Sequence, residues 1–207
     1  MNNAKEGTGK RKQIIDAAQK MFFEKGFDGV TIRAVQREVG CEVGLFYYYF
    51  KSKDEIFEVI FDRFEDDWKK SFEKAVENPE IEPFEAAKNL FESIKLAKNK
   101  LEKESRGVMH WSVKLALQRR LTKMAEPFFE KIIETIKDFG GVRTEISVRE
   151  LARLVALGIG GLLLDEEKIT SRDAVNLFES ILSTPGSVGL KARAASFARK
   201  EISVELL

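Results

Sequence analysis

Residues 31–55 read TIRAVQREVGCEVGLFYYYFKSKDE, and this stretch contains the local signals that decide the fold. Thr31 can begin a short helix, because its hydroxyl can accept a hydrogen bond from a backbone N–H that has no partner inside the helix. Gly40 ends that helix, as a glycine directly after the last periodic residue does. A second short helix is predicted from Val43 to about Phe50. The two helices and the turn between them have the dimensions of a helix-turn-helix motif.

Helical periodicity extends on both sides of this motif. Upstream, apolar residues recur at helix-face spacing over residues 10–25, and Gly26 stops that helix. Downstream, Ser52 and Glu55 form a capping box that starts a long helix to about residue 76. Because no long run alternates with period 2, the prediction is an all-α fold of about nine or ten helices. The remaining helices are expected at 84–103, 106–121, 125–139, 147–164 and 171–182, with a weakly amphipathic tail after Pro185.

Residues 11–57 combine several elements at characteristic spacing: Ile14–Ala18 followed by Phe22 and Gly26-Phe27, Thr31-Ile32 at the start of the second helix, Gly40 in the turn, and Gly44 with Tyr47, Phe50, Lys51 and Lys53. With these elements, residues 11–57 resemble the N-terminal domain of the TetR family of bacterial transcriptional regulators. The resemblance implies a three-helix helix-turn-helix DNA-binding domain at residues 1–53 and a helical ligand-binding and dimerisation domain at residues 54–207. It also implies a repressor that binds a palindromic double-stranded DNA operator as a homodimer and is released by a hydrophobic small-molecule effector.

The resemblance assigns phosphate contacts to Thr31, Tyr47 and Lys53, and Tyr48 and Lys51 are expected additions. These residue types suit that role, because hydroxyls, lysines and helix N-termini bind phosphate without reading sequence. Gly44 would let the recognition helix approach DNA closely, since it has no side chain to hold the groove away.

The residues that would face base edges depart from the family pattern. Glu42 and Val43 stand where a hydroxyl residue and a polar residue are common, Leu45 replaces a small polar residue, and Gln36 replaces a small alanine. Apolar groups can contact thymine methyls and a glutamate can accept from cytosine N4, whereas bidentate guanine readout is missing. We therefore expect an operator that is read partly by shape, with supplementary contacts from Arg33, Gln36 and Arg37.

The charge distribution differs between the two predicted domains. The whole chain has a formal net charge of +1, which taken alone gives no reason to expect a nucleic-acid partner. Residues 1–53 contain ten basic and six acidic residues, a net of +4, and the rest of the chain has a net of −3. The N-terminal Lys5, Lys10, Arg11 and Lys12 are candidates for an arm in the minor groove, and the alternative is that they only flank the first helix in solvent.

Residues 83–182 are rich in aromatic and aliphatic groups, and the resemblance places an effector pocket among the central helices. Apolar pockets with a few polar groups are the usual small-molecule sites. The alternative is that these side chains belong to an ordinary hydrophobic core. His110, the one histidine, could bind a ligand or sense pH, and the alternative is that it simply lies in the core or on the surface. The candidate pocket residues are Trp68, Phe91, Met109, His110, Trp111 and Phe128.

Two apolar bands in the last predicted helices are candidates for a dimer interface. Glycines in the first band permit close helix approach, and two such helices from each protomer would resemble the four-helix dimer interface of the family. The alternative is burial within one chain. The candidate residues are Leu151, Leu154, Val155, Gly158, Gly161, Leu162, Phe178 and Ile181.

The counts of reactive residues argue against several other classes of protein. One cysteine and one histidine are too few for a disulfide framework or a zinc site, so no metal and no cofactor is expected, and Cys41 is interpreted as an inert buried thiol rather than a redox switch. No nucleophile motif or paired carboxylates stand out, so we expect no enzyme. An interaction protein that keeps the motif but acts through protein partners stays open as an alternative.

The chain is expected to be cytoplasmic, without a membrane partner. Its longest uncharged apolar run, LVALGIGGLLL at 154–164, has eleven residues, well short of the ~20 that a membrane-spanning helix needs. The first residues, MNNAKEGTGKRK, are polar and lack the apolar segment of a signal peptide.

Overall fold

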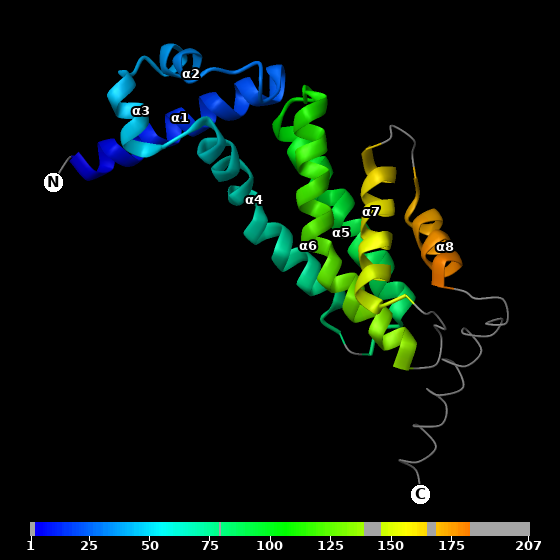
Figure 1. Cartoon of the computed structure of the whole chain (residues 1–207). Coiled ribbons are helices and arrows are strands. Elements are labelled where there is room, and N and C mark those ends of the chain that lie inside the picture. Colours follow the sequence, from blue (N-terminus) through cyan, green and yellow to red (C-terminus); the bar gives the residue numbers. More distant parts are fainter. Residues whose placement is uncertain (1–2, 79, 139–145, 165–168, 183–207) are drawn as a thin grey trace, which may run out of the picture. The chain divides into compact units, whose positions relative to one another are not determined.

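The computed structural model describes residues 3–78, 80–138, 146–164 and 169–182 (Figure 1). Within those ranges the regular structure is all α-helical, which confirms the predicted fold class. None of these helices combines the length and the apolar character that crossing a bilayer requires. In chain order the helices are α1 (Asn3–Lys25), α2 (Ile32–Val39), α3 (Val43–Tyr49), α4 (Lys53–Val76), α5 (Pro83–Glu104), α6 (Trp111–Asp138), α7 (Val148–Leu164) and α8 (Ser171–Leu182).

The chain forms two compact units. Unit 1 comprises residues 1–70 and 96–120, and therefore contains α1, α2 and α3 together with the first part of α4, the end of α5 and the start of α6. Unit 2 comprises residues 71–95 and 121–207. Three helices, α4, α5 and α6, thus contribute residues to both units.

Aromatic side chains form the centre of unit 1. Phe22 of α1 and Phe61 of α4 are fully buried. The ring of Phe57 contacts the rings of Phe22, Phe27 and Phe61, with centroid separations of 5.1–5.2 Å and edge-to-face angles, the geometry that aromatic pairs favour. This cluster joins α1 to the N-terminal half of α4.

Unit 2 is held together by apolar side chains from several helices. Phe178 of α8 is 2% exposed, and its ring lies 5.9 Å from that of Phe84 in α5 and 6.0 Å from that of Phe129 in α6. At the start of α8 the Ser171 hydroxyl donates to Glu92 of α5. Helix α8 is therefore fixed to unit 2 by both apolar and polar contacts.

One prediction about the helices is wrong. The sequence predicts separate helices at 106–121 and 125–139, whereas the structure has the single helix α6 (Trp111–Asp138) with Pro127 inside it. A proline removes one backbone donor and crowds the preceding turn, yet Pro127 lies on the exposed face. The opposite face stays continuous, because Leu121, Ala125 and Phe129 are all buried at four-residue spacing. Packing along this face outweighs the local cost, and the described residues contain eight helices rather than nine or ten.

The predicted helix ends are largely confirmed by their hydrogen bonds. The backbone N–H of Glu55 donates to Ser52 Oγ at 3.1 Å, and that of Glu150 donates to Ser147 Oγ at 3.2 Å. The hydrogen bonds from Ser147 hold the pKa of the Glu150 carboxyl below its ordinary value. A third cap, Thr170 with Asp173, was not predicted, and it lowers the pKa of Asp173 in the same way. The tail after Pro185 lies outside the described residues.

Candidate nucleic-acid interface

The turn between α2 and α3 is closed by backbone hydrogen bonds. Thr31 caps α2 as predicted, with its Oγ1 accepting from the N–H of Ala34 at 3.2 Å. At the other end Gly40 has φ +62°, and the N–H of Cys41 donates to the carbonyl of Gln36 at 3.1 Å. This is the pattern in which a left-handed glycine lets the chain reverse and satisfies the last free carbonyls of a helix.

Helix α3 is anchored on one side and exposed on the other. Phe46 and Phe50 are buried, with ring centroids 5.7 Å apart. Val43, Tyr47 and Tyr48 are 55%, 53% and 78% exposed, although residues of these types are usually more buried. Helix α3 therefore presents a methyl surface and two phenol hydroxyls, and it carries no charged residue between its ends.

The positions around this exposed side are also open. A Cβ added to Gly44 would have nothing within 4 Å, so the glycine fills no packing role inside the chain. Leu45 is half-buried. Glu42 is exposed, and its side chain makes no capping hydrogen bond to the first turn of α3. Because packing within the chain does not require a glycine at position 44, the open space there is consistent with close approach of another molecule to α3.

A broad hollow of about 850 Å³ lies beside α3. It is lined by Arg33, Gln36, Arg37, Gly40, Cys41, Glu42 and Val43. Arg33 and Arg37 are exposed there and can reach an anionic partner, whereas Gln36 is 5% exposed and its buried Nε2 has no hydrogen-bond partner. Gln36 thus reaches the wall of the hollow with only a small exposed part, and most of its side chain lies in the packing beneath it. Cys41 is only partly buried.

The predicted phosphate-binding lysines differ in their surroundings. Lys51 is exposed. Lys53 is half-buried, its Nζ donates to the carbonyl of Phe27 at 2.9 Å, and the same atom lies 4.0 Å from the centre of the Phe27 ring. Lys53 therefore links the start of α4 to the segment after α1, a structural role that the sequence did not reveal. Of the predicted arm, Arg11 lies over the ring of Phe50, 5.2 Å from its centroid.

The predicted effector residues belong to two different units. Trp68, Met109, His110 and Trp111 are in unit 1, and Phe91 and Phe128 are in unit 2. Trp68, Phe91 and Met109 are buried, whereas Trp111 is 70% exposed. The Nε1 of Trp68 is buried without a hydrogen-bond partner, a rare state for such a donor.

His110 joins the start of α6 to the end of α1. Its backbone N–H donates to the carbonyl of Phe23 at 2.7 Å, and its Nδ1 lies 2.9 Å from the Ser112 hydroxyl. Gly26 has φ +73°, and a Cβ placed on it would lie 2.3 Å from His110 Nδ1. Gly26 therefore does more than end α1, because it also makes room for the imidazole.

The predicted dimer residues divide into a buried and an exposed group. Leu151, Val155 and Phe178 are 1–4% exposed and lie in the core of unit 2. Leu154 and Ile181 are 55% and 42% exposed, together with the neighbouring Leu157 and Leu177 at 53% and 42%. Gly158 and Gly161 have open space at the Cβ position, and Leu162 is half-buried. The exposed group, not the buried one, is available to a partner.

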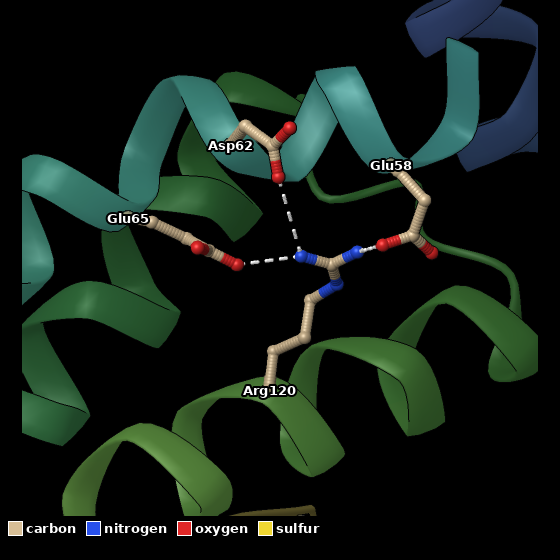
Figure 2. A network of polar contacts seen from close by, with 4 residues as sticks. All are labelled: Glu58, Asp62, Glu65 and Arg120. Carbon is tan, nitrogen blue, oxygen red and sulfur yellow. Dashed lines mark hydrogen bonds and ion pairs between the residues drawn. The ribbon is translucent and has the colours of Figure 1, made fainter. Parts of the chain in front are cut away.

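A polar network between α4 and α6 was not predicted at all (Figure 2). Arg120 of α6 pairs with Glu58, Asp62 and Glu65 of α4, and its guanidinium carbon lies 4.9 Å from the centre of the Phe61 ring. Burial lowers the pKa of Arg120 from its ordinary value. The spacing of the three carboxylates along the sequence was visible, but nothing in the sequence indicated which helix would face them.

Comparison with known proteins places this geometry in a family. The profile described as "Bacterial regulatory proteins, tetR family" matches residues 14–60, which span most of α1, all of α2 and α3, and the start of α4. The N-terminal domain of this chain belongs to the TetR family. The matched residues include the whole of α3 with its exposed side.

The likeness to individual proteins is local in sequence and broad in fold. The TetR-type domain is 47% identical over 47 residues to the HTH-type transcriptional regulator HbdR of Aromatoleum sp. (strain CIB), covering 23% of this chain and 20% of HbdR. The chain is 21% identical over 181 residues to the HTH-type transcriptional repressor DhaR of Mycobacterium sp. (strain GP1), covering 83% of this chain and 89% of DhaR. The matches to the first curated relatives span only a fifth to a third of their lengths.

The solved structures extend the comparison to the remaining helices. A tetR-family regulatory protein from Rhodococcus RHA1 superposes with a TM-score of 0.59 at 16% identity, over 85% of this chain and 98% of that protein. At this identity the likeness concerns the fold. It shows that the helices after the TetR-type domain also follow a layout found in the family.

Proposed function

We propose that this protein is a sequence-specific DNA-binding transcriptional regulator, and in particular a repressor. The observation that carries the proposal is the exposed side of α3, where Val43, Tyr47 and Tyr48 face outward around a glycine that has no internal packing role. The net charge of +4 over residues 1–53 supports it, because phosphate neutralisation supplies most of the affinity of such proteins. The names of the relatives, which are regulators and repressors, support the regulatory role.

The roles of individual side chains follow from their exposure. The hydroxyls of Tyr47 and Tyr48 and the ammonium of Lys51 would bind phosphates. Val43 would contact thymine methyls, and Arg33 and Arg37 would add contacts from the hollow beside α3. The operator would then be read through methyl contacts and DNA shape more than through bidentate contacts to guanine.

Selection of bound duplexes from a random pool tests this proposal. The expected motif is a palindrome whose half-sites are about one helical turn apart, or a multiple of that, because a dimer places its two recognition helices in separate major grooves. Invariant guanines at the positions facing α3 would contradict the proposed readout. A protein that binds no duplex even at low salt would contradict DNA binding altogether and would favour an interaction protein that acts through protein partners.

Gly44→Leu gives a sharper test of the same surface. The new side chain has open space, so the melting temperature should hardly change, while it blocks approach to the groove. We expect operator binding to weaken by about 1–3 kcal/mol or more, the scale of one disturbed base contact. Unchanged operator affinity in a folded Gly44→Leu protein would show that this side of α3 does not meet DNA.

The proposed regulator acts as a homodimer through α7 and α8. Leu154, Leu157, Leu177 and Ile181 leave an apolar face exposed in unit 2, and Gly158 and Gly161 allow a second helix to come close. Leu154→Glu should therefore give a monomer in analytical ultracentrifugation. Leu115→Glu is a matched control, because Leu115 of α6 is 52% exposed but lies outside this face. Equal sedimentation of both variants and the parent protein would contradict the proposed interface.

The repressor would be released by a hydrophobic small molecule bound among the aromatic residues of the C-terminal helices. Buried Phe91 and half-buried Phe128 support an apolar ligand, because apolar sites favour such ligands. Release requires that the ligand bind one of two conformations more tightly, since equal affinity shifts no equilibrium. Titration of the operator complex with a panel of apolar compounds tests this, and a panel in which no compound changes operator affinity would contradict a hydrophobic effector.

A further inference from the structure

The side chain of Arg120 stands opposite three carboxylates of one helix (Figure 2). Its Nη1 lies 2.6 Å from Glu65 Oε1 and 3.7 Å from Asp62 Oδ1, and its Nη2 pairs with Glu58. The arginine side chain is 17% exposed, whereas the three carboxylate side chains are 38–62% exposed. One largely enclosed cation is therefore shared by three acids that remain in contact with solvent.

The positions of these acids along α4 follow the turns of the helix. Glu58, Asp62 and Glu65 are four and three residues apart, so they lie above one another on one face, about one turn or 5.4 Å from each to the next. One carboxylate would neutralise the guanidinium, and exposed acids do not need a partner to remain charged. If α4 moved along or tilted against α6, Arg120 could release one carboxylate and keep another.

The part of α4 that carries the acids is firmly attached to the TetR-type domain. Only residues 50–52 separate α3 from α4. Lys53 Nζ donates to the Phe27 carbonyl at 2.9 Å, and the backbone N–H of Lys51 donates to Glu55 at 2.5 Å. A displacement of this part of α4 is therefore passed directly to α3.

The contact at the start of α6 differs from the one at Arg120. The His110 N–H donates to the carbonyl of Phe23 at 2.7 Å, a single uncharged hydrogen bond. Within unit 1, the residue before α6 thus makes a hydrogen bond to one partner, whereas Arg120, further along the helix, pairs with three.

We propose that Arg120 is a positioning residue for DNA binding, and that it holds α4 through interchangeable ion pairs, so that operator affinity depends on which carboxylate holds the guanidinium. The proposal rests on the proposed function and adds to it the element that sets the position of the recognition helix. Glu58 and Glu65 lie at opposite ends of the row of acids and would favour different positions of α4. In the structure Arg120 reaches both of them, and a shift of α4 along α6 would bring one nearer to the guanidinium while it moved the other out of reach.

Charge-neutral variants of the two end acids test this proposal. Glu58→Gln and Glu65→Gln should change the Kd for the operator in opposite directions, each by about three- to tenfold, the lower range of typical coupling between sites. In an Arg120→Gln background neither substitution should change the Kd further, because the shared partner is gone. Arg120→Lys should retain part of the effect, since lysine keeps the charge but not the two-pronged geometry.

A one-to-one ion pair in the same unit serves as the matched control. Lys100 of α5 pairs with Asp67 of α4 at 3.0 Å. Lys100→Gln should change the melting temperature as little as the glutamate variants do and should leave the Kd unchanged. A purely structural network would give a different result: Glu58→Gln and Glu65→Gln would weaken operator binding in the same direction and in step with their loss of thermal stability. That result would overturn the proposal.

A readout without DNA separates this proposal from the proposed function. Hydrogen exchange of backbone amides in α4 should differ between Glu58→Gln and Glu65→Gln, and the difference should vanish in the Arg120→Gln background, while α7 serves as an unchanged reference. If the parent protein bound no duplex but this pattern appeared, the proposed function would fail and the interchangeable pairing would stand. Identical exchange in all variants would overturn the pairing itself.

Discussion

Gly26 and Gly40 provide a matched pair for measuring what the contact between α1 and His110 contributes. Both glycines have positive φ, +73° and +62°, so replacement by alanine strains the backbone at either site. That strain costs about 1–2 kcal/mol per residue. At Gly40 there is nothing within 4 Å of the new Cβ, and the loss of stability should stop at this value.

At Gly26 the new methyl group collides with the imidazole of His110. The Cβ would lie 2.3 Å from Nδ1 and 2.9 Å from Cγ, and because Cγ is the ring atom nearest the backbone, a change of ring angle alone does not relieve the contact. The ring would have to leave its hydrogen bond to Ser112, worth about 0.5–1.5 kcal/mol. Forcing extra atoms into a packed site costs about 1–3 kcal/mol in general. We therefore expect Gly26→Ala to destabilise the protein by about 1–3 kcal/mol more than Gly40→Ala.

Urea denaturation followed by circular dichroism measures these values, at one protein concentration because assembly would shift the apparent stability. His110→Ala removes the ring, so the double variant Gly26→Ala/His110→Ala should lose less stability than the sum of the two single variants. Equal losses for Gly26→Ala and Gly40→Ala, or strict additivity in the double variant, would refute the reasoning from the close approach of the ring.

Two further perturbations follow from contacts in the structure. Lys53→Ala should lower the melting temperature, because it removes the hydrogen bond and the cation–π contact to Phe27. Lys51→Ala should leave stability unchanged and reduce the slope of log Kd against log salt by about 0.9, the value for one phosphate contact. A stability loss only in Lys51→Ala would contradict this assignment. The hydrogen bonds from Ser147 lower the pKa of Glu150, so their contribution to stability is complete above the ordinary glutamate pKa of ~4.3 and is lost as the pH falls through the lower folded-state pKa. Glu150→Gln should therefore be less stable than the parent protein at neutral pH, and the difference should shrink in acid denaturation curves below about pH 4; a difference that stays constant down to pH 2 would contradict the linkage.

Features of the fold that depend only on residues close together in the sequence were predictable. The capping role of Thr31 and the end of α2 at Gly40 were predicted correctly, because such signals act within one turn of helix. The break expected before Pro127 was wrong, since whether a helix continues there depends on the buried face formed by residues far along the helix. Local rules describe the ends of helices better than they describe continuity.

The candidate site shows the same division. Tyr47 and Tyr48 face outward because the same helix buries two phenylalanines on its other side, and their predicted contact with phosphate stays a prediction. The position of Gln36 in the packing and the engagement of Lys53 by the Phe27 carbonyl were not predictable. Both depend on which residues α1, α2 and α4 bring together, and no spacing within the sequence records that.

The three helices that pass through both compact units restrict how this protein can be cut and recombined. A chimera that joins residues 1–53 to the C-terminal domain of another protein would lack residues 54–70 and 96–120, which belong to the same compact unit as the helix-turn-helix motif. Phe61 and Arg120 would both be lost from it. A graft that keeps unit 1 intact therefore has to transfer two separate segments of the chain. Such a graft would need three junctions, each of them inside a helix.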